Sequence, residues 1–380
     1  MFELKFTEEQ NMLREMVKDF ATNELKPRAA EIDENEEIPQ EIINQIRELG
    51  ILGVAFPEDY GGSGFGEVGY CLVQEEMGRA CLSTATFVGA HVSIGTNSIY
   101  LDGSEELKQK YVTQLASGEK IGAFALTEER AGSDAFDLVT KAEKDGNEWV
   151  INGEKLWITN GPFADIFSVY ARTKRGITGF VVEKDMPGFS AGAPEKKMGI
   201  RGSKTSSLTF ENVRVPEENV IGREGRGFLT AMKTLDAGRL GLGAACLGAC
   251  KELLELSTEY SKQRKQFHEP ISHFQAVQFM LAEMATQIYI VESLVYRTAV
   301  LYDLGKLQSR QSAMVKLVSS EALDKCVDLA MQVHGGMGYS RELPIERFYR
   351  DSRINRIFEG TSEIQKMVIA RDVIKKNGKI

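Results

Sequence analysis

The 380-residue sequence predicts an α+β protein in which a β domain lies between two helical ones. Apolar residues recur with helical spacing in the first third of the chain, with strand-like spacing in the middle, and with helical spacing again towards the end. This segregation argues against an alternating βαβ fold. We expect three domains: an N-terminal helical domain (1–121), a middle β-barrel-like domain (122–226) and a C-terminal helical bundle (227–380).

The N-terminal region carries clear helix boundaries. Thr7, with Gln10 three residues later, forms the pattern of a capping box, and an apolar face follows it. Pro39 opens a second helical segment that is expected to end at Gly50. The glycines of "FPEDYGGSGFG" do not fit the G-x-G-x-x-G fingerprint, so this stretch is expected to be an ordinary loop.

The middle region is typical of strands joined by short turns. The runs "WVINGEKLWIT", "GITGFVVEKD" and "SSLTFENVRVP" have strand character, and "KDGNE" before the first of them is a hairpin turn signal. "RGSKTS" is not a Walker A motif, because Ser203 separates the glycine from the lysine. From Phe228 onward the helical periodicity returns in long segments.

Composition excludes several classes of function. The net charge of -9 argues against non-specific binding of nucleic acid. No stretch approaches the roughly 18 apolar residues of a membrane span, and the first residues lack the pattern of a signal peptide, so we expect a cytoplasmic protein. The five cysteines form no CxxC pair and the four histidines are scattered, so neither a disulfide framework nor a metal site is expected.

Four separated motifs point to one family. They are "ALTEERAGSD" (125–134), "LWITNG" (156–161), "QVHGGMGYSRELPIERFYRD" (332–351) and "FEGTSEIQ" (358–365). In this order and spacing they resemble the acyl-CoA dehydrogenase family over nearly the whole chain. The resemblance implies an FAD enzyme that removes hydrogen from the α and β carbons of an acyl-CoA thioester. It also implies a homotetramer that passes electrons to an electron-transferring flavoprotein.

The resemblance assigns cofactor contacts to residues that would otherwise have ordinary interpretations. Alone, Thr127 belongs to a turn, Trp157 to the core and Arg264 to a solvated basic patch. Arginine also suits pyrophosphate, because its planar fork bonds phosphate oxygens in pairs. The FAD contacts that the resemblance implies are Phe124, Leu126, Thr127, Trp157, Ile158, Thr159, Arg264, Gln266, Phe267, Phe274, Gln275, Gln332, Val333, Gly335, Gly336, Thr361 and Glu363.

Substrate contacts follow from the same resemblance, and some positions depart from the family pattern. The implied substrate-binding residues are Ser133, Asp236, Arg239, His91, Phe358 and Gly360. Glu129, Arg130 and Asp137 stand where the family has proline or small residues, and His268 replaces a glycine. Phe358 replaces a tyrosine. His334 is expected to be a neutral packing residue.

The predicted catalytic base is Glu359, in the stretch "RIFEGTSEIQ". Removing a proton beside a thioester needs a base, and a carboxylate in a dry pocket has a raised pKa and is a stronger base. We expect Ile357 and Phe358 to supply that dry wall. Some family members carry the base immediately before the arginine at 239, but this chain has Gly238 there. The base is therefore assigned to Glu359.

The sequence leaves the substrate and acceptor open. Short or medium acyl groups are favoured, branched ones included, and a cyclic acyl-CoA is the alternative. An acyl-CoA oxidase on the same fold is the nearest rival activity. A flavin- or acyl-CoA-binding protein without turnover is a rival of another class.

Overall fold

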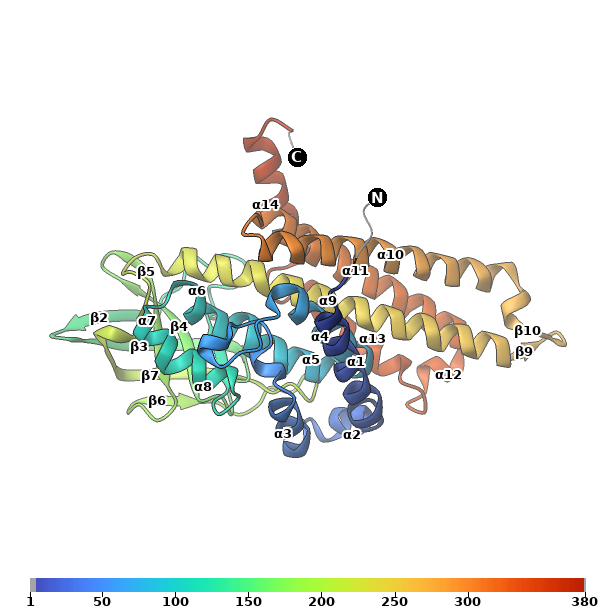
Figure 1. Cartoon of the computed structure of the whole chain (residues 1–380), viewed down its shortest axis with the longest axis horizontal. Helices are drawn as coiled ribbons and strands as arrows, with labels where there is room; N and C mark the ends of the chain where they lie inside the picture. Colours follow the sequence, from blue (N-terminus) through green and yellow to red (C-terminus); the bar gives the residue numbers. More distant parts are fainter. Residues whose placement is uncertain (1–4, 379–380) are drawn as a thin grey trace.

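The computed structural model describes residues 5–378 and has its large β-sheet at one end of an elongated molecule (Figure 1). The helices of the C-terminal third form a bundle that extends to the other end, and the N-terminal helices pack between the two. The order of helices, then strands, then helices matches the predicted α+β class.

The N-terminal third is helical, as predicted. Its helices are α1 (Glu8–Phe20), α2 (Lys26–Asn35), α3 (Gln40–Glu48), α4 (Gly66–Ala80), α5 (Leu82–Gly89), α6 (Asn97–Asp102), α7 (Glu105–Leu107) and α8 (Thr113–Ala116), with short π-helical turns η1 (Ala21–Leu25), η4 (Ala90–Thr96) and η5 (Lys108–Val112). Both bonds of the predicted capping box between Thr7 and Gln10 are present. The helix after Pro39 ends just before Gly50, whose φ of 68° suits a glycine.

The strands of the middle region form one eight-stranded sheet. Its members are β1 (Gly122–Ala125), β2 (Lys141–Asp145), β3 (Glu148–Thr159), β4 (Ile166–Thr173), β5 (Gly176–Glu183), β6 (Phe189–Ala191), β7 (Thr205–Pro216) and β8 (Val220–Ile221). The order is β6-β7-β3-β2-β4-β5-β8, with β1 added in parallel to β4. The predicted hairpin turn joins β2 to β3 through two residues, since Asp145 pairs with Glu148 and Gly146 has φ 62°.

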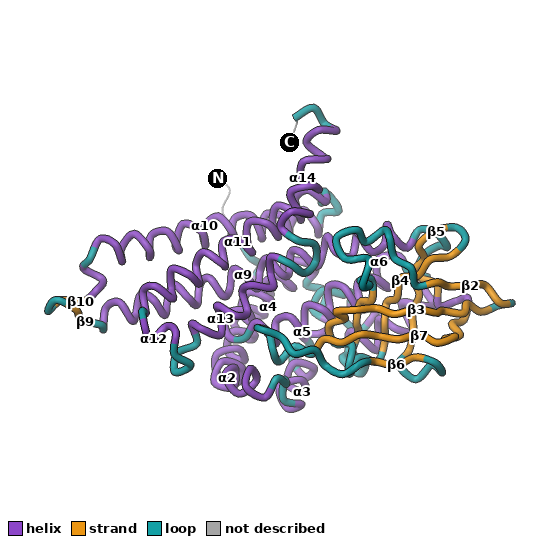
Figure 2. The backbone as a smooth tube through the Cα atoms, turned by 180° about the vertical axis from the view of Figure 1, so that it is seen from behind, coloured by secondary structure: helices purple, strands orange, loops and turns teal. Residues whose placement is uncertain are grey.

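The C-terminal third is a helical bundle. It contains α9 (Gly227–Gln263), α10 (Gln275–Asp303), α11 (Ser309–His334), α12 (Gly336–Tyr339), α13 (Ile345–Ser352) and α14 (Ser362–Lys375), with a small hairpin of β9 (Lys265–Gln266) and β10 (Glu269–Pro270). Helix α9 has many small and apolar residues, is buried along most of its length, and runs from the sheet to the far end of the bundle (Figure 2).

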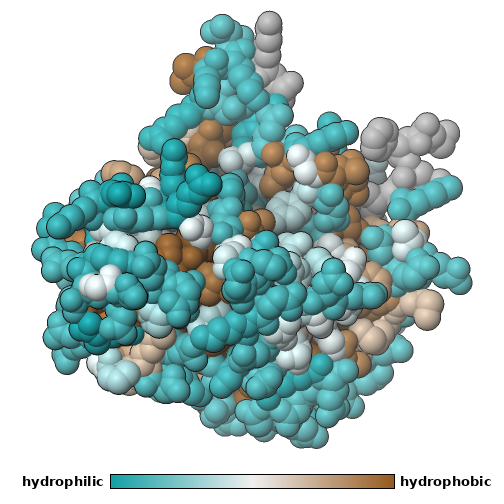
Figure 3. Space-filling view, turned by 60° about the vertical axis from the view of Figure 1, so that its left-hand side comes forward, coloured by the Kyte–Doolittle hydropathy of each residue, from teal (hydrophilic) through white to brown (hydrophobic). Residues whose placement is uncertain are grey.

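Helix α14 projects from the body of the molecule, and Figure 3 shows a mostly hydrophilic face with small, separate hydrophobic patches. Within residues 5–378, no helix combines the length and apolar character that crossing a membrane requires.

Candidate active site

Glu359 lies in a tight turn between the 3₁₀ segment η8 (Arg353–Arg356) and α14. Its φ is 53°, and the next residue, Gly360, has φ 91°. Three side chains hold this turn through its carbonyl oxygens. Gln365 donates to both carbonyls (3.1 and 2.8 Å), Arg239 donates to that of Glu359 (3.3 Å), and Lys316 donates to that of Gly360 (2.8 Å). The left-handed backbone, uncommon for a glutamate, is thus fixed by its surroundings.

The carboxyl group of Glu359 is turned into the protein. The residue as a whole is half-buried, but its Oε2 atom is out of contact with solvent and has no hydrogen-bond partner within residues 5–378. It faces Gly238 of α9, where an added Cβ would lie 2.6 Å from Oε2 and 2.9 Å from Cγ2 of Ile94. A side chain at 238 would therefore occupy the space that the Glu359 carboxyl fills.

Burial raises the pKa of Glu359 to about 7, while the charges of Arg239 and Lys316 act in the opposite direction. Lys316 is itself buried, and burial lowers its pKa to about 8. A carboxyl group with a pKa near 7 can both take up and release a proton at neutral pH.

The wall around this carboxyl group differs from the prediction. Ile357 is 47% exposed, so it does not form the dry wall that the sequence suggested. Phe358 is half-buried against the main core. The apolar contact comes from Ile94 of η4 and from the bare backbone of Gly238. The error arose because chain neighbours of a residue in a tight turn point in different directions.

Asp236 and Arg239, both predicted to contact substrate, form an ion pair of 2.8 Å one turn apart on α9. Ser309 donates to the other oxygen of Asp236 (2.5 Å). Arg239 is therefore held between Asp236 and the Glu359 carbonyl. The predicted contact Ser133 lies elsewhere, exposed in the loop after β1.

His91 is fully buried and both of its ring nitrogens are engaged by the backbone. Nε2 donates to the Leu115 carbonyl (3.0 Å) and Nδ1 accepts from the Gly122 N–H (2.9 Å). Burial lowers its pKa to about 4, so the ring is neutral. Neither nitrogen is free for a substrate or a proton, which makes His91 a link between η4 and the start of β1.

The predicted flavin residues of the middle region lie close together. The Leu156 N–H donates to the Thr127 carbonyl (2.9 Å), which joins the loop after β1 to β3. Trp157 has φ 59° at a register shift between β3 and β7, and its side chain is 61% exposed. Ile158, the next residue, is buried, and so are Phe124 and Leu126 of β1 and the loop after it. The hydroxyls of Thr127, Thr159 and Ser133 make no hydrogen bond to any described residue.

A buried ion pair supports this arrangement. Lys155 Nζ donates to Glu128 (2.7 Å) and to the Leu126 carbonyl (3.0 Å), and both charged side chains are almost fully buried. Glu128 also accepts from the N–H groups of Val139 and Thr140. The pair therefore ties both ends of the loop that carries Thr127 and Ser133 to β3. The unusual residues Arg130 and Asp137 pair at 3.7 Å on the exposed side of this loop.

The second predicted FAD segment lies at the opposite end of the molecule. Arg264, Gln266 and Phe267 belong to the β9–β10 hairpin, and Phe267 is 86% exposed. Phe267 and His268 both have positive φ in its turn. Phe274 and Gln275 begin α10, and Gln332, Val333, Gly335 and Gly336 end α11 and begin α12. Figures 1 and 2 agree that the β9–β10 hairpin and α12 lie at the end of the molecule away from strand β3.

The remaining predicted residues lie at the start of α14. The Thr361 hydroxyl caps this helix by accepting from the Ile364 N–H (3.3 Å). Glu363 is exposed in its first turn. Thr361 therefore has a structural role that follows from its position.

Sequence reasoning missed Lys316, Tyr70 and Gln74, which lie near Glu359 or on the same side of α9. A signal was available in the glycines of "GRLGLG", because glycine inside a helix is unfavourable unless something packs against it. Gly238 faces Glu359, and Gly241 faces the Tyr70 ring.

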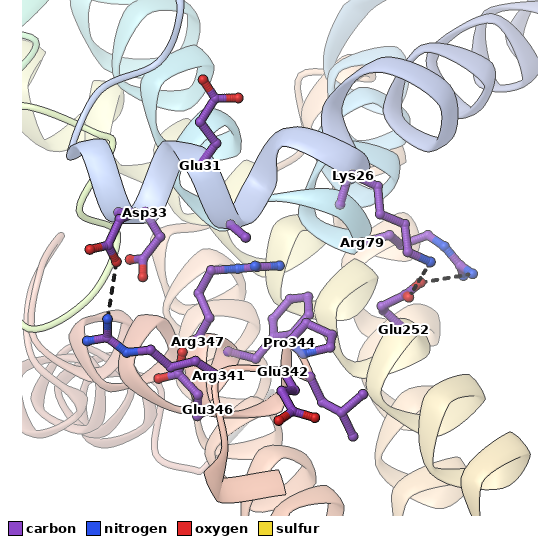
Figure 4. Close-up of a pocket in the computed structure, with 15 residues that line it drawn as sticks. Lys26, Glu31, Asp33, Arg79, Glu252, Arg341, Glu342, Pro344, Glu346 and Arg347 are labelled. Carbon is purple, nitrogen blue, oxygen red and sulfur yellow. Dashed lines mark hydrogen bonds and ion pairs between the residues drawn. The ribbon is translucent and has the colours of Figure 1, made fainter. Parts of the chain in front are cut away.

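A cavity of about 530 Å³ lies elsewhere, between α2, α4 and the segment before α13 (Figure 4). Its lining is mostly charged, and Lys26 and Arg79 both approach Glu252 (2.6 and 3.7 Å). It contains none of the predicted site residues. Among residues 5–378, no three His, Cys, Asp or Glu side chains gather as a metal site, and all five cysteines are free and buried.

Comparison with known proteins identifies the class. Family models of acyl-CoA dehydrogenase match in three parts: the N-terminal domain at 7–119, the middle domain at 123–213 and the C-terminal domain at 225–374. The chain belongs to the acyl-CoA dehydrogenase family, whose members are oxidoreductases acting on CH–CH groups. The resemblance noted from the sequence is confirmed.

Two curated relatives span the whole chain. A probable acyl-CoA dehydrogenase of Bacillus subtilis (YngJ) is 45% identical over 380 residues, covering 98% of this chain and 100% of its own. A short-chain-specific acyl-CoA dehydrogenase of Clostridium acetobutylicum is 42% identical over 378 residues, covering 98% and 100%.

Solved structures share the fold. Butyryl-CoA dehydrogenase of Megasphaera elsdenii has a TM-score of 0.96 at 40% identity, covering 98% of this chain and 100% of that one. An acyl-CoA dehydrogenase of Bacillus anthracis complexed with FAD has a TM-score of 0.93 at 40% identity, and the match covers 98% of this chain and 68% of that one. A chain from a structure on the electron transferring flavoprotein of Acidaminococcus fermentans has a TM-score of 0.96 at 41% identity, covering 98% and 100%.

Proposed function

We propose that this protein dehydrogenates a short acyl-CoA thioester to the 2-enoyl-CoA, with Glu359 as the base that takes the α proton. The observation that carries this assignment is the buried carboxyl oxygen of Glu359, which has no partner and faces a glycine. A buried polar atom without a partner is costly and calls for an explanation, and a catalytic role is one such explanation. A substrate C–H placed against this oxygen supplies that role.

The residues around the turn prepare Glu359 for this role. Its backbone N–H donates to no described residue, so it is available to the thioester oxygen, where negative charge develops as the α proton leaves. Arg239 and Lys316 hold the two neighbouring carbonyls and keep the turn in place. A pKa near 7 leaves a large fraction of the carboxyl group ionised at neutral pH.

The chain's own residues fit FAD as the cofactor. Trp157 presents an exposed aromatic ring beside the free hydroxyls of Thr127 and Thr159. Arg264 has no ion pair among the described residues, and an added Cβ at Gly335 or Gly336 would meet nothing within 4 Å, so the backbone there is open to a close approach. FAD, when bound, would accept the hydride from the β carbon. The relative from Bacillus anthracis, complexed with FAD, supports this choice.

The substrate range and the electron acceptor are drawn from relatives. A short-chain-specific enzyme and a butyryl-CoA dehydrogenase match the chain along its full length, which favours a short acyl group. The match to a chain from the Acidaminococcus structure supports an electron-transferring flavoprotein as acceptor. Branched and cyclic acyl-CoAs belong in the same substrate panel.

The test is anaerobic flavin bleaching by a panel of linear, branched and cyclic acyl-CoAs. Glu359→Gln keeps the size of the side chain and the backbone N–H, so FAD and acyl-CoA should still bind. Loss of a general base typically costs about 10²–10⁴-fold in rate. The bound thioester should perturb the flavin spectrum of this variant without bleaching it. Glu342→Gln, an exposed change outside the site, is the matched control.

Three outcomes would contradict the proposal. Bleaching of Glu359→Gln at near the parent rate would assign the base to another residue. A yellow protein that no acyl-CoA bleaches would be a binding protein. Rapid formation of hydrogen peroxide in air by the parent would identify an oxidase.

A further inference from the structure

One face of α4 carries three buried polar side chains, Glu67, Tyr70 and Gln74, at spacings that place them on adjacent turns. Each is less than 5% exposed, and each has a polar atom without a hydrogen-bond partner among the described residues. These atoms are Oε1 of Glu67, the hydroxyl of Tyr70 and Nε2 of Gln74. The Ser93 hydroxyl lies near that of Tyr70 and donates its own proton to the Gly89 carbonyl (2.7 Å), so towards Tyr70 it can act only as an acceptor.

These atoms lie beyond the Glu359 carboxyl along α9. Gly238 and Gly241 are one helical turn apart, about 5 Å along the axis. An added Cβ at Gly238 would lie 2.6 Å from Glu359 Oε2, and one at Gly241 would lie 2.5 Å from the Tyr70 hydroxyl. The carboxyl and the hydroxyl therefore stand over successive turns of the same helix.

Gln74 shares the space around the Tyr70 hydroxyl. A Cβ added at Gly89 of α5 would lie 3.4 Å from that hydroxyl and 3.5 Å from Gln74 Nε2. The hydroxyl and the amide thus both point to the side of Gly89 where a side chain is missing. An acyl group whose α carbon lies at Glu359 would reach this side of Gly89 after roughly four bonds of about 1.5 Å each.

The chemistry of the three groups is that of neutral hydrogen-bond donors. Tyr70 offers an O–H and Gln74 offers N–H groups. Burial, together with the neighbouring Asp303, raises the pKa of Glu67 well above its ordinary value, which favours its neutral acid form. The causes that shift the pKa of Glu67 are burial and the charge of Asp303, and neither is a cation. A carboxylate placed there would meet no cation, whereas a hydroxyl or carbonyl oxygen would meet donors.

We infer that the acyl group of the substrate carries a neutral oxygen, as a hydroxyl or a carbonyl, near its fifth carbon, and that Tyr70 and Gln74 bind this oxygen. The inference rests on the proposed function, because it takes the α carbon to lie at Glu359. It makes Tyr70 and Gln74 specificity-determining residues. A plain alkyl chain of the same length would leave both groups buried and unpaired, which a site built from polar groups penalises.

The test compares 5-hydroxypentanoyl-CoA with hexanoyl-CoA, which have the same number of non-hydrogen atoms. The parent holoenzyme should favour the hydroxyacyl thioester by at least about tenfold in kcat/KM for anaerobic flavin reduction. Gln74→Met and Tyr70→Phe should each lower that ratio about tenfold, and Gln74→Met should keep or raise Tm because an unpaired polar group is removed. Tyr100→Phe and the exposed Gln109→Met are the matched controls and should leave the ratio unchanged.

A binding measurement separates specificity from turnover. Titration of both thioesters into the Glu359→Gln holoenzyme should give a preference in Kd of the same direction, without any chemistry. The inference is overturned if the parent takes hexanoyl-CoA as well as 5-hydroxypentanoyl-CoA, even when Glu359-dependent bleaching upholds the proposed function. If neither thioester nor any other acyl-CoA binds or bleaches the flavin, the proposed function fails and the inference with it.

Discussion

At the residue scale, the environment of Glu359 combines opposing electrostatic effects. Burial favours the neutral acid, while the charges of Arg239 and Lys316 favour the carboxylate. The outcome is a pKa near 7, and only the carboxylate can take the α proton. The kcat/KM for flavin reduction should therefore rise with pH through about 7 and fall roughly tenfold per pH unit well below it.

Lys316→Met should move this pH profile to higher pH. The positive charge of Lys316 lowers the Glu359 pKa, so its removal should raise that pKa by at least about half a unit. The measurement is the pH dependence of kcat/KM for anaerobic flavin reduction, with Tm and flavin content to verify folding. Lys325→Met, on the same helix but partly exposed and paired with Glu283, should leave the apparent pKa unchanged. An unmoved profile in a folded Lys316→Met protein would show that this charge does not tune the base.

At the scale of elements, the loop after β1 depends on one buried ion pair. Lys155 of β3 and Glu128 hold the loop that presents Thr127 and the strand that presents Trp157. A buried pair is weak evidence of net stability, but breaking it on one side leaves an uncompensated buried charge. The consequences of removing one partner and of removing both should therefore differ.

Lys155→Met should destabilise the protein by about 3–5 kcal/mol and lower its flavin content, because Glu128 is left charged and buried without its partner. Adding Glu128→Gln in the same protein should recover a large part of that stability. The free energies of unfolding in urea of the parent, both single variants and the double variant together form a double-mutant cycle. Lys184→Met breaks a partly exposed pair with Asp165 and should cost no more than about 1 kcal/mol. If the losses of stability in the two single variants simply add in the double variant, the two side chains are not coupled.

At the scale of the whole molecule, most of the predicted FAD contacts fall into two groups at opposite ends of one chain, while Thr361 and Glu363 lie at the start of α14. Large apolar side chains are exposed on and around the bundle, among them Phe267, Phe279, Tyr289 and Tyr339. Both facts support the proposal that the β9–β10 hairpin of one chain completes the cofactor site of another, within a homotetramer. Such exposed apolar residues are typical of surfaces that pack against a partner.

Arg264→Ala should weaken FAD retention, because charge-assisted bonds to the pyrophosphate are worth about 1.5–3 kcal/mol, or roughly 10- to 100-fold in Kd. Flavin content after dialysis and sedimentation measure retention and assembly together. Arg175→Ala, a change at an exposed arginine on the turn between β4 and β5, should retain FAD like the parent. A monomeric parent that keeps its full FAD would contradict the shared site.

The sequence by itself determined the features that depend on neighbouring residues. The capping box at Thr7, the helix end at Gly50, the turn at Gly146 and the helix–strand–helix order all follow from local conformational preference and periodicity. The motif around Glu359, with the absence of a base at Gly238, was enough to propose the catalytic residue.

The tertiary structure alone decided what lies against that residue. Glu359 meets Gly238, Ile94 and Lys316, which come from three other elements between 43 and 265 positions away in the chain. It also decided that Ile357 faces outward, that both nitrogens of His91 are occupied, and that Tyr70 and Gln74 both lie near Gly89. The physical reason is that side-chain contacts between distant segments depend on how whole helices cross, and local preference does not encode those crossings.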